Sequence, residues 1–271
     1  MTLQCRRPPV QAIPFVQIAV GLCTILACAI IVHEKDREFS GGRDAPWISD
    51  LASFRPEHFV FGIGFTIVAV LGCVVSFFLY TSLGVFVPIH KRVLRVLQIV
   101  SIIFLVFASI SFAFLAWFNN EDIPAAHTAF TGIFFACVLI FMLLNLLTWS
   151  LTLHFWRKRG PDEEVVSGKG MDGPSWEYVV AHLRTAMVWK TVALAGVVVG
   201  LVGLAICSIE AICEEVVNGK KETCIPLQNT QSSFQYVTIL FILTGLASLS
   251  IELGLPVRGE ENAGDEGDQN A

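Results

Sequence analysis

Six long apolar runs constrain the fold of this chain more than any other feature. They lie near residues 13–33, 59–86, 97–118, 127–155, 186–209 and 234–255. A helix needs roughly 20 apolar residues to cross the hydrocarbon core of a bilayer, and each run is long enough. The runs are continuous rather than alternating, which excludes a membrane β-barrel. The sequence therefore predicts an all-α fold, an integral membrane bundle of six transmembrane helices.

The composition agrees with a membrane protein and indicates a single domain. Only 15% of the 271 residues are charged and 54% are hydrophobic, whereas about a quarter of a soluble domain is charged. The segments between the runs are short, so residues 1–255 are predicted to form one transmembrane domain. Residues 256–271 are predicted to be a disordered acidic tail. This tail supplies much of the net charge of −5, and we expect no nucleic-acid partner.

The distribution of basic residues predicts the orientation. Six crossings place both termini on one side, together with eleven of the 18 Lys and Arg residues; six others lie on the opposite side, and Lys190 lies within the fifth run. By the positive-inside rule, both termini are predicted to be cytoplasmic. The strongest signal is a basic patch of six residues, Lys91, Arg92, Arg95, Arg157, Lys158 and Arg159. It is expected to fix the topology or to bind anionic lipid or a cytoplasmic protein partner.

Several residues within the runs have predicted packing roles. Asn145 and Gln235 are expected to form hydrogen bonds between helices, and Lys190 is expected to reach water by snorkelling. A small-residue face in the fifth run is predicted to pack within the chain rather than against a second copy. That face consists of Gly196, Gly200 and Gly203.

Two of the eight cysteines, Cys213 and Cys224, share one predicted outside loop. In an oxidising compartment this pair forms either a disulfide or two free thiols, and the spacing alone does not decide between them.

The candidates for chemistry are few. If the chain is an enzyme, they are Asp50, Glu57 and His127, all on the predicted outer side. The structural interpretation is favoured: Glu57 with Pro56 begins the second span, Asp50 caps a short turn, and Trp47 anchors at the interface. No catalytic motif of the serine-hydrolase, zinc-protease or P-loop type is present. We therefore expect no metal and no cofactor, and a non-enzymatic role is favoured.

Two stretches resemble a eukaryotic six-helix membrane family of the DRAM/Frag/Sfk type. Its members share a CWH-like N-terminal domain. The first is "APWISDLASFRPEHFVFGIGF" and the second is "NNEDIPAAHTAFTGIFF". At "SSFQYVTILF" the chain departs from the family, because Gln235 stands where members often carry Glu. The matching positions are Pro46, Trp47, Ile48, Ser49, Pro56, Glu57, Phe61 and His127.

The resemblance implies two alternative functions. Autophagy modulators and regulators of a phosphatidylinositol 4-kinase belong to this family, which implies a non-enzymatic regulator that acts through lipid or a cytoplasmic partner. A Golgi factor that remodels GPI anchors belongs to it too, which implies lipid remodelling at the lumenal face through Asp50, Glu57 and His127. The implied location is the lysosome, the Golgi or the plasma membrane.

Overall fold

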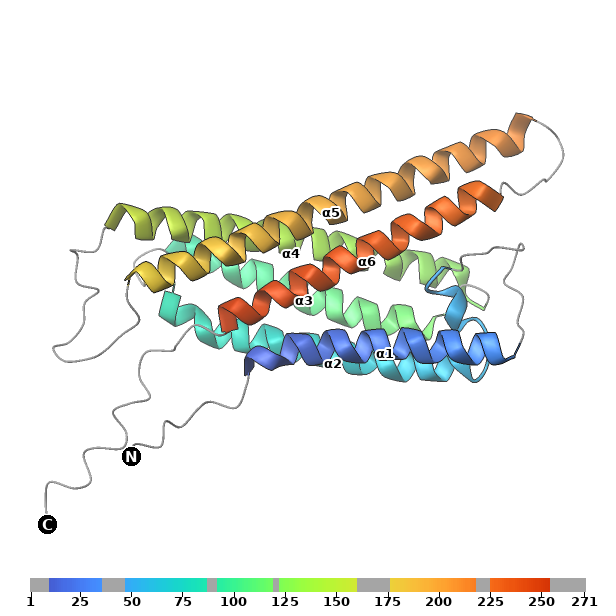
Figure 1. Ribbon diagram of the computed structural model, residues 1–271, viewed down its shortest axis with the longest axis horizontal. Coiled ribbons are helices and arrows are strands. Elements are labelled where there is room, and N and C mark those ends of the chain that lie inside the picture. The colour runs from blue at the N-terminus through green and yellow to red at the C-terminus, as the bar shows by residue number, and fades with distance from the viewer. Residues whose placement is uncertain are drawn as a thin grey trace, which may run out of the picture.

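A computed structural model describes residues 10–35, 47–86, 92–118, 122–159, 176–217 and 225–253 (Figure 1). Within these ranges the chain forms long helices, two short 3₁₀ helices and no strand, which confirms the all-α prediction. The long helices are α1 (Ile13–Glu34), α2 (Glu57–Phe86), α3 (Arg92–Trp117), α4 (Pro124–Arg159), α5 (Trp176–Val217) and α6 (Ile225–Leu253). The short ones are η1 (Val10–Ala12) and η2 (Asp50–Ala52).

The helices extend beyond the apolar runs that predicted them, most of all in α5, which begins at Trp176 and ends at Val217. The difference arises because hydropathy marks the part of a helix within lipid, whereas the helical backbone continues into polar sequence. All six helices contain a segment long and apolar enough to cross a membrane. The chain is therefore a multi-pass membrane protein.

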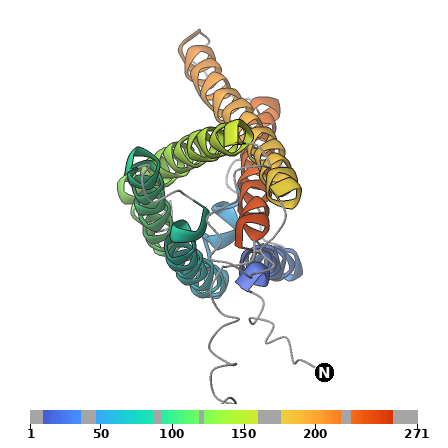
Figure 2. The same cartoon turned by 90° about the vertical axis from the view of Figure 1, so that its left-hand side faces the viewer.

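The six helices form a ring in which each packs against its successor and α6 returns to α1 (Figure 2). We call one end of this bundle the η2 end, because η2 lies there beside the end of α1 and the start of α2 (Figure 1). We call the opposite end the basic end, where α3 begins with Arg92 and the last turn of α4 carries Arg157 and Lys158. The start of α1 and the end of α6 lie at the basic end; its cytoplasmic orientation stays a prediction.

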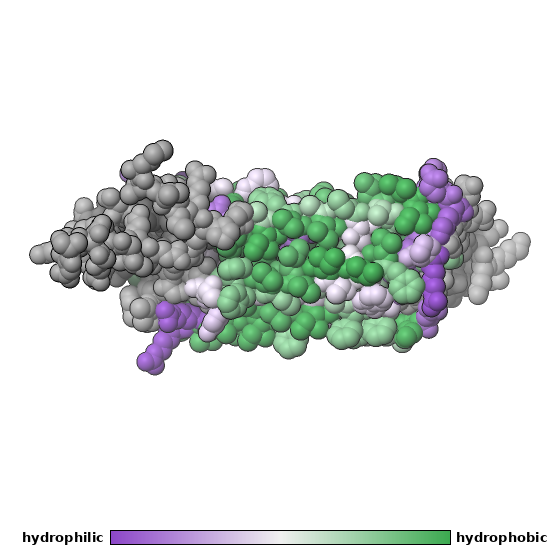
Figure 3. Space-filling model, turned by 90° about the horizontal axis from the view of Figure 1, so that it is seen from below, coloured by the Kyte–Doolittle hydropathy of each residue, from purple (hydrophilic) through white to green (hydrophobic). Residues whose placement is uncertain are grey.

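On the face shown in Figure 3, apolar side chains form a broad belt across the middle of the molecule, and hydrophilic residues lie toward its ends. Large side chains such as Phe77, Leu240 and Val93 are more than half exposed on the outside of the helices. A continuous belt of this kind suits hydrocarbon rather than water as the surrounding solvent. Smaller side chains fill much of the interior, including Val75, Ala193 and Val197, which are fully buried.

Helices α5 and α6 make the closest contact in the bundle, which we call the glycine seam. A Cβ atom added at Gly196 would meet the ring of Phe241, and one at Gly203 would meet the ring of Phe234. Glycine lets two backbones approach closely in lipid, where packing rather than hydrophobicity drives association. The predicted small-residue face thus packs within the chain, as expected. Its third member, Gly200, lies against Thr238.

Candidate functional site

A cavity of about 280 Å³ lies inside the ring toward the η2 end. Helices α1, α2, α3, α4 and α6 line it together with residues 47–49, so it is enclosed by most of the ring. Its volume is near the lower end of the roughly 300–1,000 Å³ typical of small-molecule sites. The walls are largely aromatic and aliphatic, and they include Phe65, Leu105, Phe112, Phe134, Ile239 and Leu243.

Helices α4 and α6 form a wall of the cavity in which they make few direct contacts with each other. Helix α4 packs mainly against α3, and α6 packs mainly against α5 and α1, yet both line the cavity. They approach each other at Gly245, where an added Cβ would lie 3.1 Å from Cε of Met142. This contact lies at the inner end of the cavity, because Leu246 lines it and the next turns of α6 do not. Along the rest of the cavity the two helices make few direct contacts with each other.

Polar groups from three segments gather at the end of the cavity nearest η2, and we call them the rim. They are Trp47, Ile48 and Ser49 before η2, His127 and Thr128 at the start of α4, and Gln235 in α6. The backbone N–H of Ile48 donates to Oε1 of Gln235 at 3.0 Å and so fastens the loop to α6. The sequence predicted that Gln235 bonds to another helix. This expectation was wrong, because the donor to its side-chain oxygen is the backbone of the loop before η2.

The ring of His127 is held in one orientation at the rim. Its Nδ1 lies 2.6 Å from the carbonyl oxygen of Phe118 at the end of α3. A carbonyl only accepts hydrogen bonds, so Nδ1 is the donor, and the tautomer that fits this contact has its lone pair on Nε2. The backbone N–H of His127 also donates to the carbonyl of Ile123 at 3.0 Å. This arrangement provides one acceptor of fixed tautomer beside the cavity.

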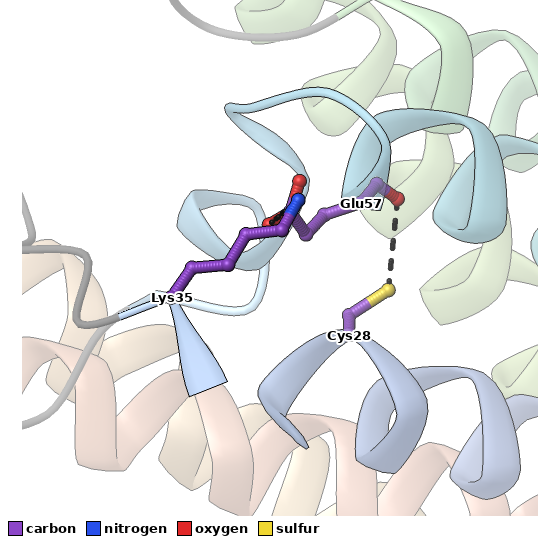
Figure 4. Close-up of polar contacts among 3 residues, drawn as sticks. All are labelled: Cys28, Lys35 and Glu57. Atoms are coloured by element: carbon purple, nitrogen blue, oxygen red, sulfur yellow. Dashed lines mark hydrogen bonds and ion pairs between the residues drawn. The ribbon is translucent and has the colours of Figure 1, made fainter. Parts of the chain in front are cut away.

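Glu57 is fully buried at the start of α2, where it joins the end of α1 (Figure 4). Its Oε1 lies 3.5 Å from Nζ of Lys35, whose side chain is 38% exposed. The thiol of Cys28 donates to the backbone carbonyl of Glu57 at 3.7 Å. The position at the helix start agrees with the structural interpretation, with Pro56 immediately before the helix. A buried carboxylate needs such compensation, because its transfer from water is costly.

Asp50 closes the turn that leads into η2. Its Oδ2 accepts a hydrogen bond from the backbone N–H of Trp47 at 3.0 Å, and its own N–H donates to the carbonyl of Trp47 at 3.0 Å. Of the three candidates for acid–base chemistry, only His127 lines the cavity, while Asp50 and Glu57 make these structural contacts. Among the described residues, no group of His, Cys, Asp or Glu side chains has the arrangement of a metal site.

The basic patch is brought together in part. Because α3 and α4 are antiparallel neighbours, Arg92, Arg157 and Lys158 lie at the same end of the bundle, where all three are exposed. Arg95 lies one turn further into α3 and is half-buried. Other predicted residues fall elsewhere: Pro46, Lys91 and Cys224 lie outside the described residues, as do the side chains of Arg159 and Cys213. The disulfide and the acidic tail therefore stay predictions.

A second, smaller cavity of about 30 Å³ adjoins the inner end of the first and contains the residues that the sequence placed least well. Asn145 of α4 and Lys190 of α5 both line it. Lys190 is only 6% exposed, so the expectation that it snorkels to water was wrong. Neither amide atom of Asn145 has a hydrogen-bond partner within the described residues, so the expected interhelical bond was wrong as well. A polar residue in mid-span was the available signal, but it does not reveal which partner lies opposite.

Over residues 9–255 the chain matches the family described as the Frag1/DRAM/Sfk1/Cwh43P N-terminal domain, and it belongs to that family. Searches of curated proteins and of solved structures each found no match. The family resemblance seen in the loop before α2 and at the start of α4 is thus confirmed over nearly the whole membrane domain.

Proposed function

We propose that this protein is a non-enzymatic membrane regulator that binds one lipid acyl chain in the large cavity. The cavity carries this proposal, because its walls are mostly apolar and most of its polar lining residues gather at the rim. Its lining in α6 runs from Gln235 to Leu246, which at 1.5 Å per residue is about 16 Å. This is about half of the roughly 30 Å hydrocarbon core, the depth of one leaflet.

The rim suits the uncharged part of a lipid headgroup. Ser49, Thr128 and Gln235 offer hydroxyl and amide groups, and His127 offers an acceptor at Nε2. Such groups hydrogen-bond to glycerol, ester or amide oxygens and nitrogens at the level of the membrane interface. A lipid that enters between α4 and α6 places its chain in the cavity and leaves its headgroup at the rim.

Regulation follows from the two helices that connect the cavity with the basic patch. Helix α3 carries Leu105 in the cavity wall and Arg92 at the basic end, and α4 carries Phe134 and Arg157 in the same way. An occupied cavity fixes the separation of these helices and so the spacing of the exposed cations. This spacing would control a cytoplasmic partner or an anionic lipid surface, consistent with a phosphoinositide-kinase or autophagy role in the lysosome, Golgi or plasma membrane.

The test is labelling of the protein in native membranes by a phospholipid with a photoactivatable acyl chain. Thr131→Trp and Leu243→Trp fill the cavity from α4 and α6, and each is expected to lower labelling at least fivefold. The matched controls are Ile133→Trp and Leu240→Trp, whose side chains face outward on the same helices. Equal labelling of cavity and control variants would contradict the proposal.

The regulatory part is tested separately by charge reversal at Arg92, Arg157 and Lys158. We expect loss of partner recruitment in cells with no change in lipid labelling. Unchanged recruitment and unchanged location of the tagged protein would refute a role of the basic end while leaving lipid binding intact.

One observation favours a second candidate, remodelling of GPI anchors. The oriented ring of His127 lies beside a cavity of acyl-chain depth, where Nε2 has the lone pair that a general base requires. His127→Ala would then change the acyl chains of GPI anchors at normal protein level, whereas His127→Ala with unchanged anchors disposes of this candidate.

A further inference from the structure

The small cavity is positioned as the inner extension of the large one. Four apolar residues line both cavities: Leu105, Val138, Ile242 and Leu246. Beyond them the lining is still mostly apolar, with Phe141, Met142 and Leu249, but it also includes Asn145 from α4 and Lys190 from α5. We call Asn145 and Lys190 the polar floor, because they place two polar side chains at the inner end of the interior, in the direction in which an acyl chain would extend.

Asn145 is the residue that most requires a ligand. It is 1% exposed, it lines the small cavity, and both its Oδ1 and its Nδ2 are without a hydrogen-bond partner among the described residues. Its neighbours do not supply one: the hydroxyl of Thr148 donates to the carbonyl of Leu144, and that of Ser248 donates to the carbonyl of Gly245. Buried amides nearly always have partners, so an occupant of the cavity is expected to supply them.

Lys190 adds a cation to the same cavity. Ionisable side chains inside membrane bundles are rare, and they mark ligand or ion sites when they face the interior. The volume of about 30 Å³ admits a group the size of roughly two or three water molecules, since one water needs roughly 10–15 Å³ on this measure. A phosphate headgroup is too large for this space, whereas a carboxyl group has the right size.

We propose that the small cavity binds the carboxyl group of a single-chain fatty acid, whose hydrocarbon chain lies in the large cavity. A protonated carboxyl donates its O–H to Oδ1 of Asn145 and accepts from Nδ2 with its other oxygen. An ionised carboxylate accepts from Nδ2 and is attracted to the ammonium group of Lys190. The assignment rests on the proposed function, because it needs the large cavity to hold an acyl chain. The fatty acid lies in the opposite direction to a lipid whose headgroup is at the rim, so the two are alternative occupants of the same cavity.

Competition for a photoactivatable palmitic acid tests the assignment on the purified full chain in lipid nanodiscs. For the wild type, we expect palmitic acid to displace the probe at a concentration at least ten times lower than hexadecanol does. Asn145→Leu and Lys190→Met should each reduce this advantage to less than threefold, and either variant suffices if the other does not fold. Lys158→Met, which removes an exposed cation from α4, is the control and should keep the tenfold advantage.

The outcomes separate the two proposals. Equal displacement by acid and alcohol in the wild type overturns the carboxyl assignment but leaves acyl-chain binding standing. An unchanged acid preference in both variants indicates that the small cavity holds water only, which also overturns the assignment. If Leu243→Trp abolishes labelling by the probe, the chain occupies the large cavity as proposed. A wild type that is not labelled at all overturns both proposals.

Discussion

Helix α6 takes part in two contrasting regions, the glycine seam with α5 and the loose wall with α4. Phe234, Thr238 and Phe241 recur at helical spacing on the face that meets the glycines of α5. Gln235, Ile239 and Ile242 follow the same spacing one position later, on the face that lines the cavity. One helix therefore makes a close contact on one side and leaves a space on the other.

The difference arises from the residues opposite. The seam offers glycine on the partner helix, so the aromatic rings of α6 fit against backbone. The cavity offers Phe65, Phe112 and Phe134, which hold the surrounding helices apart; the ring centroids of Phe112 and Phe134 are 4.8 Å apart. In lipid the hydrophobic effect does not push helices together to fill such a space. The hydrogen bonds at the rim therefore have to position the helices that line the cavity.

The largest expected effect is in the seam. Gly196→Leu would drive a side chain into the ring of Phe241, and overpacking of this kind costs about 3 kcal/mol or more where neither backbone can shift. We expect a lower unfolding temperature in detergent. The measurement is the temperature at which buried Cys28 begins to react with a fluorogenic maleimide.

The control for the seam is Gly132→Leu in α4, since no atom lies within 4 Å of a Cβ added there. It should leave the unfolding temperature unchanged or slightly higher, because leucine favours helix over glycine by about 0.5–1 kcal/mol. Similar losses at Gly196 and Gly132 would show that the seam is not the tighter region.

A smaller effect is expected at the ion pair beside the rim. Lys35→Met leaves the carboxylate of Glu57 fully buried without this cation, whereas Glu57→Gln leaves a lysine that is already 38% exposed and reaches water. We expect Lys35→Met to cost about 2 kcal/mol and Glu57→Gln about 1 kcal/mol. The order of the two unfolding temperatures is the measurement, and the reverse order contradicts this account of the pair.

The rim bond between the loop and α6 should have a still smaller effect. Gln235→Ala leaves the N–H of Ile48 without its acceptor, at a cost of about 1 kcal/mol. Gln235→Glu keeps an acceptor oxygen and should lose less stability. Lipid labelling should fall with Gln235→Ala, since the loop closes one end of the cavity. If both variants behave alike, the acceptor at this position does not hold the rim, and the family's Glu needs another explanation.

The sequence was sufficient for features that depend on one helix at a time. Apolar length gave the six spans, Glu57 marked the start of α2, and the glycine spacing gave the contact face of α5. It was insufficient where two helices meet, because the rotation of each helix about its axis depends on packing. Asn145 and Lys190 were visible as polar residues in separate runs, but only the ring brings them to one cavity.

The smallest expected change in stability belongs to the residue with the strongest proposed role in binding. Asn145→Leu removes a buried amide without hydrogen-bond partners in the described structure and replaces it with an apolar group of similar size. Such a replacement is neutral or stabilising, here by up to about 1 kcal/mol, because no hydrogen bond is lost and a desolvated group is removed. We expect an unfolding temperature equal to or above that of the wild type without added fatty acid.

Added palmitic acid should then stabilise the wild type but not the variant, since ligand stabilises only a protein that binds it. A marked fall in the unfolding temperature without ligand would mean that Asn145 holds the helices together, and the polar floor would then be a packing feature like the seam.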